Sequence, residues 1–278
     1  MLSYRHGFHA GNHSDVLKHI CLIYFIKSIK KSYNSIIYID THAGGGIYSL
    51  ENEYMKKNME YLSGINKIVN FKTDDPIIRF YLKTIRNINE SKKIKFYPGS
   101  PKIVEYLTDN KDKLYFYELH SNEYKELKKN FKINSNVKIK KKDGFTFFDE
   151  LKTKDQKGLI LIDPSYEIKD DYQKVIDFIK DNYSKFNNKI ILIWYPILDR
   201  EHTNDFIDEF KKTGIKDILR IEMPIKNDSE ERGMTGSGLI AINTHQKTAL
   251  NLRGSIKELQ NCLQLKDNKK RVIVNYLR

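Results

Sequence analysis

The stretch Gly158-Leu159-Ile160-Leu161-Ile162-Asp163-Pro164-Ser165-Tyr166-Glu167 decides the fold of this chain. A short, continuous apolar run between turn residues is typical of a strand buried on both faces of a parallel sheet. Ligands of open α/β sheets bind beyond the carboxyl ends of such strands. The stretch therefore predicts Asp163, Pro164 and Tyr166 at a functional site. The simpler interpretation is a proline turn in which Asp163 only caps the next helix.

Similar strand patterns recur along the chain and alternate with helical patterns. Strands are predicted at 35–40, 113–118, 136–140, 189–195, 217–224 and 238–243, with an edge strand at 272–277. Helices are predicted at 14–31, 101–108, 122–131, 172–182, 204–212 and 248–263. This alternation predicts one α/β domain over residues 1–278, with a mostly parallel sheet of about seven strands and helices on both faces. The connection 226–237 is too short for a crossover helix, so the last hairpin is expected to be antiparallel.

Length and composition exclude several classes of protein. The 278 residues, 40% of them apolar, support a real core in one large domain. No apolar run approaches the roughly 18 residues of a membrane span, and the first residues do not resemble a signal peptide. The cysteines, Cys21 and Cys262, are far apart and outside any CxxC pair, which argues against disulfides and cysteine zinc sites. We expect a monomer in a reducing cytoplasm, with no metal and no membrane contact.

The charge and the first residues point to nucleic acid. A net charge of +13 attracts polyanions, although the excess is mostly lysine, a bias that an AT-rich genome also produces. Residues 1–13 lack a helical or strand period and carry Tyr4, Arg5 and His6, the stacking rings and planar cation of a nucleic-acid contact. Two alternatives to a nucleic-acid contact remain for these first residues. They form a tail packed on the core, or they contribute to a metal site built from His6, His9, His13 and His19 without an acidic or cysteine ligand.

Residues 47–95 interrupt the alternation of strands and helices. They predict two or three polar helices, at 52–63, 65–71 and 75–88, and so a helical insertion subdomain. Such an insertion serves either as a solvated surface or as a lid or nucleic-acid contact.

Two predicted strands before the opening stretch also end in acids. The strand 35–40 ends at Asp40 and runs into Thr41-His42-Ala43-Gly44-Gly45-Gly46, where glycines let backbone N–H groups approach a ligand closely. The spacing is neither GxGxxG nor that of a P-loop. Glu118 ends the strand 113–118, and an acid there can accept hydrogen bonds from both hydroxyls of a ribose. The insertion accounts for the long gap between the glycines and Glu118.

The order of these features resembles the class I S-adenosylmethionine-dependent methyltransferase fold. Asp163-Pro164-Ser165-Tyr166 resembles the [DNS]-P-P-[YFW] motif of methyltransferases that modify exocyclic amines, with Ser165 where proline is usual. The lone pair of adenine N6 is delocalised into the ring, so N6 is a poor nucleophile. The Asp163 carboxylate and the Pro164 carbonyl would accept its two N–H bonds, and Tyr166 would stack on the extruded base. Serine at 165 is expected to affect loop stiffness more than chemistry.

Five sequence blocks resemble one family in order along nearly the whole chain. They are YRHGFHAGNHSDVLKH at 4–19, DTHAGGGIY at 40–48, YPGSP at 97–101, DG at 143–144 and GMTGSG at 233–238. The chain is therefore similar to the bacterial 23S rRNA adenine-N6 methyltransferases, the large-subunit methyltransferase J family. That family also has a small helical insertion after its glycine loop, which residues 47–95 would supply.

The resemblance implies N6-methylation of an adenine in 23S rRNA with S-adenosylmethionine as cofactor. It implies a cofactor pocket lined by Lys18, His19, His42, Ser100, Glu118, Asp143, Gly144 and Asp163. Glu118 would take the ribose hydroxyls, Asp143 the adenine amine of the cofactor, and Lys18 would lie near the methionine carboxylate. Asp163 would be the catalytic acceptor, with Pro164 and Tyr166 beside it. Tyr4, with Arg5 and His6, would meet the RNA.

Three other functions remain as alternatives. A DNA adenine-N6 methyltransferase needs a target-recognition domain for the major groove, and the sequence offers no second domain of sufficient size. A protein-glutamine methyltransferase uses a similar motif, usually with asparagine first. A non-catalytic RNA-binding protein would need the positive charge but not Asp163.

Overall fold

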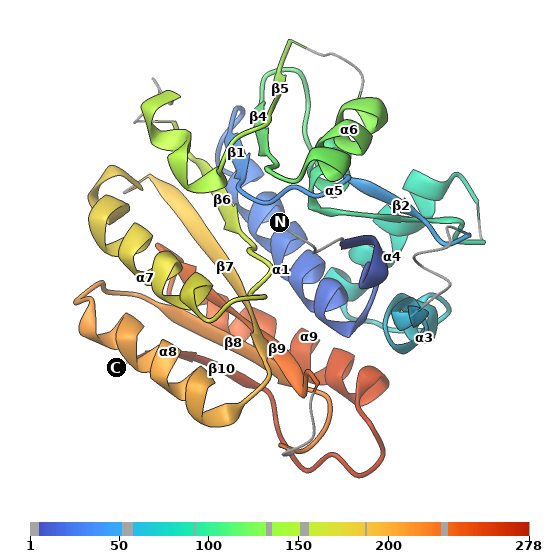
Figure 1. The fold of residues 1–278 in the computed structure, drawn as a ribbon. Helices are drawn as coiled ribbons and strands as arrows, with labels where there is room; N and C mark the ends of the chain where they lie inside the picture. The colour runs from blue at the N-terminus through green and yellow to red at the C-terminus, as the bar shows by residue number, and fades with distance from the viewer. Residues whose placement is uncertain are drawn as a thin grey trace.

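The computed structural model describes residues 6–51, 58–91, 93–131, 135–150, 156–186, 188–228 and 233–277 (Figure 1). Its helices, with η marking 3-10 turns, are η1 (His6–Phe8), α1 (His13–Lys30), η2 (Glu60–Ser63), α3 (Ile65–Ile68), α4 (Pro76–Asn89), α5 (Ser100–Leu107), α6 (Ser121–Asn130), η3 (Gly144–Glu150), α7 (Asp170–Asn182), η4 (Tyr183–Phe186), α8 (Arg200–Lys212) and α9 (Thr248–Leu263). Its strands are β1 (Ile37–Asp40), β2 (Ile47–Ser49), β3 (Phe96–Pro98), β4 (Lys113–Tyr117), β5 (Val137–Lys140), β6 (Gly158–Ile162), β7 (Lys189–Ile197), β8 (Leu219–Pro224), β9 (Gly236–Ile242) and β10 (Ile273–Tyr276).

One mixed sheet organises the fold, in the order β10-β8-β9-β7-β6-β1-β4-β5. The strands from β5 to β7 are parallel, and β9 runs antiparallel between β7 and β8, as the short connection predicts. If the strands of this sheet are renumbered 1 to 7 in chain order, from β1 to β9, their order across the sheet, read from the β5 edge, is 3-2-1-4-5-7-6. The predicted α/β class I methyltransferase fold is confirmed. The predicted number of about seven strands is corrected to eight, because the edge strand at 272–277 joins the sheet as β10 beside β8.

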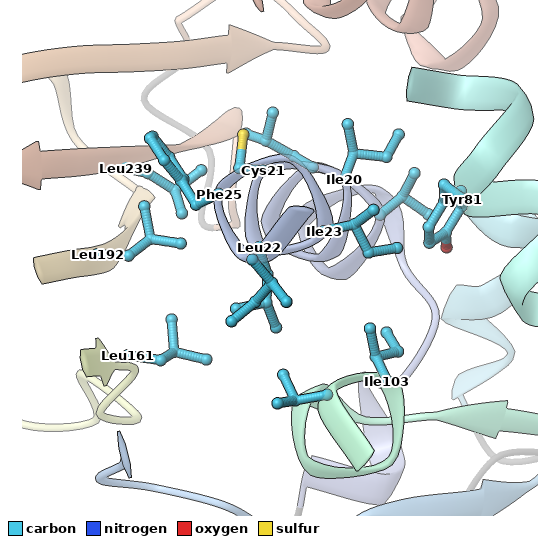
Figure 2. Close-up of a cluster of buried hydrophobic side chains, with 14 of the residues drawn as sticks. Ile20, Cys21, Leu22, Ile23, Phe25, Tyr81, Ile103, Leu161, Leu192 and Leu239 are labelled. Atoms are coloured by element: carbon cyan, nitrogen blue, oxygen red, sulfur yellow. The ribbon is translucent and has the colours of Figure 1, made fainter. Parts of the chain in front are cut away.

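Helix α1 lies at the centre of the larger hydrophobic core. Figure 2 shows Leu161, Leu192 and Leu239 of the sheet on one side of α1, and Tyr81 of α4 and Ile103 of α5 on the other. A helix that is covered on all sides needs apolar residues all round, and most of α1 is buried from its first residue. The remaining core lies on the opposite face of the sheet, where α7 and α8 pack.

The start of α1 lies closer to the N-terminus than predicted. The cap is Asn12, whose side chain accepts hydrogen bonds from the backbone N–H groups of Ser14 and Asp15, the two residues predicted as caps. An asparagine is as good a cap as either of them, so the helix begins at His13. The predicted irregular arm is correspondingly shorter, since residues 6–8 form η1 and residues 10–13 are buried.

The insertion is not purely helical. Strand β2 at its start and strand β3 just after its end pair antiparallel and form a two-stranded sheet apart from the main sheet. Within it, α4 confirms the predicted helix at 75–88, whereas only the short α3 forms in the predicted helix at 65–71. Residues 52–57 of the predicted helix 52–63 lie outside the described residues, and residues 60–63 form the 3-10 helix η2. The faces of α4 and α3 that carry Ile78, Tyr81 and Ile65 join the same core as α1.

In the described parts of the chain, each helix is either too short or too polar to cross a bilayer.

Candidate active site

A cavity with a volume of about 230 Å³ lies beyond the carboxyl ends of β1, β4 and β6. All eight residues that the family resemblance implies for a cofactor pocket line it, together with Pro164: Lys18, His19, His42, Ser100, Glu118, Asp143, Gly144 and Asp163. They come from segments far apart in the sequence. They meet because the carboxyl ends of adjacent parallel strands lie at one edge of the sheet.

Glu118 occupies the position just after β4, beside the glycine loop. Its two carboxylate oxygens accept hydrogen bonds from the backbone N–H groups of Gly44, at 2.8 Å, and His120, at 2.6 Å. Burial disfavours the charged carboxylate and raises the pKa of Glu118 to about 7, even though the two N–H groups act in the opposite direction. Glu118 therefore changes its charge near neutral pH.

The Asp143-Gly144 pair forms another part of the cavity wall. A Cβ atom at Gly144 would lie 2.0 Å from the carbonyl oxygen of Thr41, so only glycine fits there. This close approach brings the segment after β5 against the loop after β1. The Asp143 carboxylate is exposed and lies at the rim of the cavity.

Asp40 does not line the cavity itself but binds the lining residue Ser100, a contact for which no role was predicted from the sequence. Its carboxylate is fully buried at the end of β1 and accepts hydrogen bonds from the Tyr38 hydroxyl, at 2.8 Å, and the Ser100 hydroxyl, at 2.6 Å. Burial raises the pKa of Asp40 to about 6. Gly99, not Ser100, holds the cap position of α5, so the Ser100 side chain is free to bind Asp40. The signal that singled out Glu118, an acid at a strand end, also applied to Asp40.

Lys18 is bound to the acid of the opening motif. Its ammonium lies 2.6 Å from Asp163 and 2.8 Å from Asp15, and the lysine is almost completely buried. Burial alone would lower the pKa of Lys18, but the two carboxylates outweigh this effect and keep it above its ordinary value. The family resemblance placed Lys18 near the methionine carboxylate of a cofactor. In the structure, its partners are carboxylates of the protein itself.

Tyr166 faces away from the cavity that Asp163 and Pro164 line. Its backbone is left-handed, with φ of 52°, and its side chain is 5% exposed. The hydroxyl donates to the carbonyl oxygen of Trp194 at 2.7 Å, and the ring centroid lies 4.4 Å from that of Tyr172. The predicted stacking of Tyr166 on a base therefore requires a different conformation of this loop.

The N-terminal histidines do not converge on one point. His9 binds Glu60 of η2 at 2.7 Å, whereas His19 binds the hydroxyl of Tyr97 at 2.8 Å. Burial lowers the pKa of His13 to about 4. In the described segments, no group of three histidine, cysteine, aspartate or glutamate side chains is arranged to hold a metal ion. Tyr4 and Arg5 lie outside the described residues, and of His6 only the backbone, in η1, is described.

Comparison with known proteins identifies relatives of this chain. A family model described as "Ribosomal RNA large subunit methyltransferase D, RlmJ" matches residues 33–270. Proteins named ribosomal RNA large subunit methyltransferase J from Escherichia coli K12 and Haemophilus influenzae are 42% and 41% identical over 249 and 246 residues. Each alignment covers 87% of this chain and 87% of the relative.

A solved structure extends the similarity to the three-dimensional fold. The crystal structure of protein LPL1258 from Legionella pneumophila superposes with a TM-score of 0.82 at 32% identity, covering 97% of this chain and 98% of that one. Family model, relatives and fold lead to the same conclusion. The chain belongs to the ribosomal RNA large subunit methyltransferase J family and is an S-adenosylmethionine-dependent methyltransferase, which confirms the predicted family, enzyme class and cofactor.

Proposed function

We propose that the protein methylates N6 of an adenine in 23S rRNA, with Asp163 as the group that orients the amine. The observation that carries the proposal is that Asp163 and Pro164 line the same cavity as Glu118 and Asp143. A nucleoside-containing cofactor at Glu118 would therefore point its reactive end at the motif that binds exocyclic amines. The names of the E. coli and H. influenzae relatives, both large-subunit rRNA methyltransferases, support the substrate class.

The side chains that line the cavity match the hydrogen-bond donors and the purine ring of S-adenosylmethionine. Glu118 offers two carboxylate oxygens to the ribose hydroxyls, and Asp143 offers an acceptor to the adenine amine. Leu119 and Phe145 line the same end of the cavity and can cover the faces of a purine ring. When bound, the cofactor supplies an electrophilic methyl group on a positively charged sulfur.

Asp163 and Pro164 prepare the adenine amine for attack. The Asp163 carboxylate and the Pro164 carbonyl accept the two N6–H bonds, which turns the nitrogen lone pair out of the ring plane and toward the methyl group. As positive charge develops on N6, the carboxylate stabilises it and can take the proton that N6 loses. Lys18 holds this carboxylate in place at 2.6 Å.

The RNA is proposed to approach from the N-terminal side of the cavity. Tyr4 and Arg5 directly precede η1, which begins at His6, and α1 places Lys18 on Asp163. The net charge of +13 favours binding to a phosphate backbone. To reach Asp163, the target adenine must leave its stack, and Tyr166 is proposed to support the extruded base once its loop has moved.

The test is methyl transfer from labelled S-adenosylmethionine to protein-free rRNA, duplex DNA and a peptide pool in separate reactions. Label should enter rRNA alone, and nucleoside analysis should identify it as N6-methyladenine. Label in DNA or peptide but not in rRNA would refute the proposed substrate. A full rate in Asp163→Ala would refute the role of Asp163, while the family assignment would stand.

A further inference from the structure

A chain of three buried polar groups connects the helical insertion to the cavity. Tyr81 of α4 lies with its hydroxyl 3.3 Å from that of Tyr97 in β3, and the Tyr97 hydroxyl lies 2.8 Å from Nδ1 of His19 in α1. All three side chains are fully buried. His19 lines the cavity, whereas neither tyrosine does. The hydroxyls of the two tyrosines therefore reach the cavity through His19.

The hydrogen-bonding capacity of the three groups fixes the direction of the chain. Burial raises the pKa of both tyrosines, so both hydroxyls keep their protons and each needs an acceptor. Among the described residues, Tyr97 is the one partner of the Tyr81 hydroxyl. If Tyr81 donates to Tyr97, then Tyr97 can donate to Nδ1 of His19 and both protons are satisfied. The reverse direction leaves the Tyr81 proton buried without an acceptor, which is unfavourable.

This direction also determines the tautomer of His19. When Nδ1 accepts a hydrogen bond, the proton of the neutral imidazole resides on Nε2, which makes Nε2 a donor. We propose that Tyr97 and Tyr81 are positioning residues for the cofactor: they hold His19 as the Nε2–H tautomer, which donates a hydrogen bond to an acceptor of S-adenosylmethionine. The proposal rests on the assignment of the cavity to that cofactor, and it gives the insertion a role in cofactor binding.

Packing holds the two tyrosines in the required places. The Tyr97 ring stacks on His19 with a centroid distance of 5.5 Å and an interplanar angle of 28°. Its other neighbours include Gly11, where an added Cβ would lie 3.2 Å from the ring. Figure 2 shows Tyr81 extending from α4 toward Ile23 of α1. The position of the Tyr97 ring is therefore set by its packing on His19 and Gly11, and that of the Tyr81 ring by the packing of α4 on α1.

The tautomer can be observed without any ligand. Long-range ¹H–¹⁵N spectra of the ¹⁵N-labelled protein distinguish Nε2–H from Nδ1–H histidine, and the His19 signals are assigned by their loss in His19→Gln. We expect Nε2–H in the wild-type protein and a mixture of tautomers in Tyr97→Phe, which keeps the stacked ring but loses the hydroxyl. An Nδ1–H signal in the wild-type protein would overturn the proposal, whatever the protein binds.

Calorimetric titration with S-adenosylmethionine tests the consequence for binding. Tyr97→Phe should raise the Kd about five- to tenfold, the size of one hydrogen bond, and Tyr81→Phe about two- to threefold. The double variant should match Tyr97→Phe, because Tyr81 acts only through Tyr97. Tyr183→Phe, which removes a hydroxyl bonded to Asn243 away from the cavity, serves as the control and should leave the Kd unchanged.

The outcomes separate this proposal from the proposed function. Additive effects of Tyr81→Phe and Tyr97→Phe, or a wild-type Kd in Tyr97→Phe, would overturn the hydrogen-bond chain while cofactor binding stands. A wild-type protein that binds no S-adenosylmethionine would instead refute the assignment of the cavity. In a methylation assay, Tyr97→Phe should raise KM for the cofactor and leave kcat within about twofold, since His19 does not touch the target amine.

Discussion

The affinity for S-adenosylmethionine should fall as the pH is lowered from 8 to 6, because Glu118 loses its charge in this range. The ribose hydroxyls of the cofactor are hydrogen-bond donors, so they need the ionised carboxylate. Burial raises the pKa of Glu118 from 4.5 to about 7, although its oxygens accept hydrogen bonds from Gly44 and His120. In the free protein, protonated Glu118 therefore becomes the main form below about pH 7.

The magnitude follows from the fraction of ionised Glu118. If only the ionised form binds, the Kd is multiplied by the reciprocal of that fraction, which is about 1.1 at pH 8, about 2 at pH 7 and about 11 at pH 6. The Kd should therefore rise roughly tenfold from pH 8 to pH 6. The raised pKa of Glu118 also affects the free energy of unfolding. It stabilises the folded protein at low pH, and this stabilisation is lost as the pH rises from 4.5 to about 7.

Calorimetric titration at half-unit intervals of pH measures this dependence, with Glu118→Gln as the matched control. The variant should bind roughly 10- to 100-fold more weakly at pH 8, because it loses hydrogen bonds to a charged acceptor. Its Kd should vary little with pH, so any dependence that persists belongs to other groups, such as Asp40, whose pKa is about 6. A wild-type Kd that is constant from pH 6 to pH 8 would refute the argument.

Three further substitutions test the site and its surroundings. Asp163→Asn should lower kcat on rRNA about 10²–10³-fold, because a neutral amide cannot stabilise the developing charge. Single-turnover rates measure this loss, and the Kd for the cofactor should stay within a few-fold of the wild-type value. Gly144→Ala should cost about 1–3 kcal/mol of unfolding free energy, since its Cβ would meet the Thr41 carbonyl at 2.0 Å; a urea midpoint equal to that of the wild type contradicts this. Glu60→Gln should cost about 1 kcal/mol or less in the same assay, because its partner His9 is partly exposed; a more stable variant contradicts the stabilising role of this ion pair.

The backbone plan and the shared cavity could be predicted from the sequence for one reason. Buried parallel strands are apolar runs, and their carboxyl ends meet at one edge of the sheet. An acid at such an end, like Glu118 or Asp163, therefore has a predictable location even when a long insertion intervenes. Asp40, at the end of β1, obeys the same rule and could have been predicted in the same way.

The directions of individual side chains could not be predicted in this way. Tyr166 turns into the core because a left-handed backbone at a single position reorients it, and no local pattern announces that φ. Lys18 carries a flexible side chain that takes whichever carboxylates the fold brings near, and these come from positions 15 and 163. The pairing of β2 with β3 also lies beyond local patterns, since nearly fifty residues separate the two short strands.

The burial of α1 has a consequence for how this enzyme can fail. The helix that fills the centre of the core also carries Lys18 and His19 into the cavity. Elements with many buried apolar contacts open only when the whole domain unfolds. The part of the cavity wall that α1 forms therefore cannot melt ahead of the scaffold, and heat inactivation should coincide with loss of the fold.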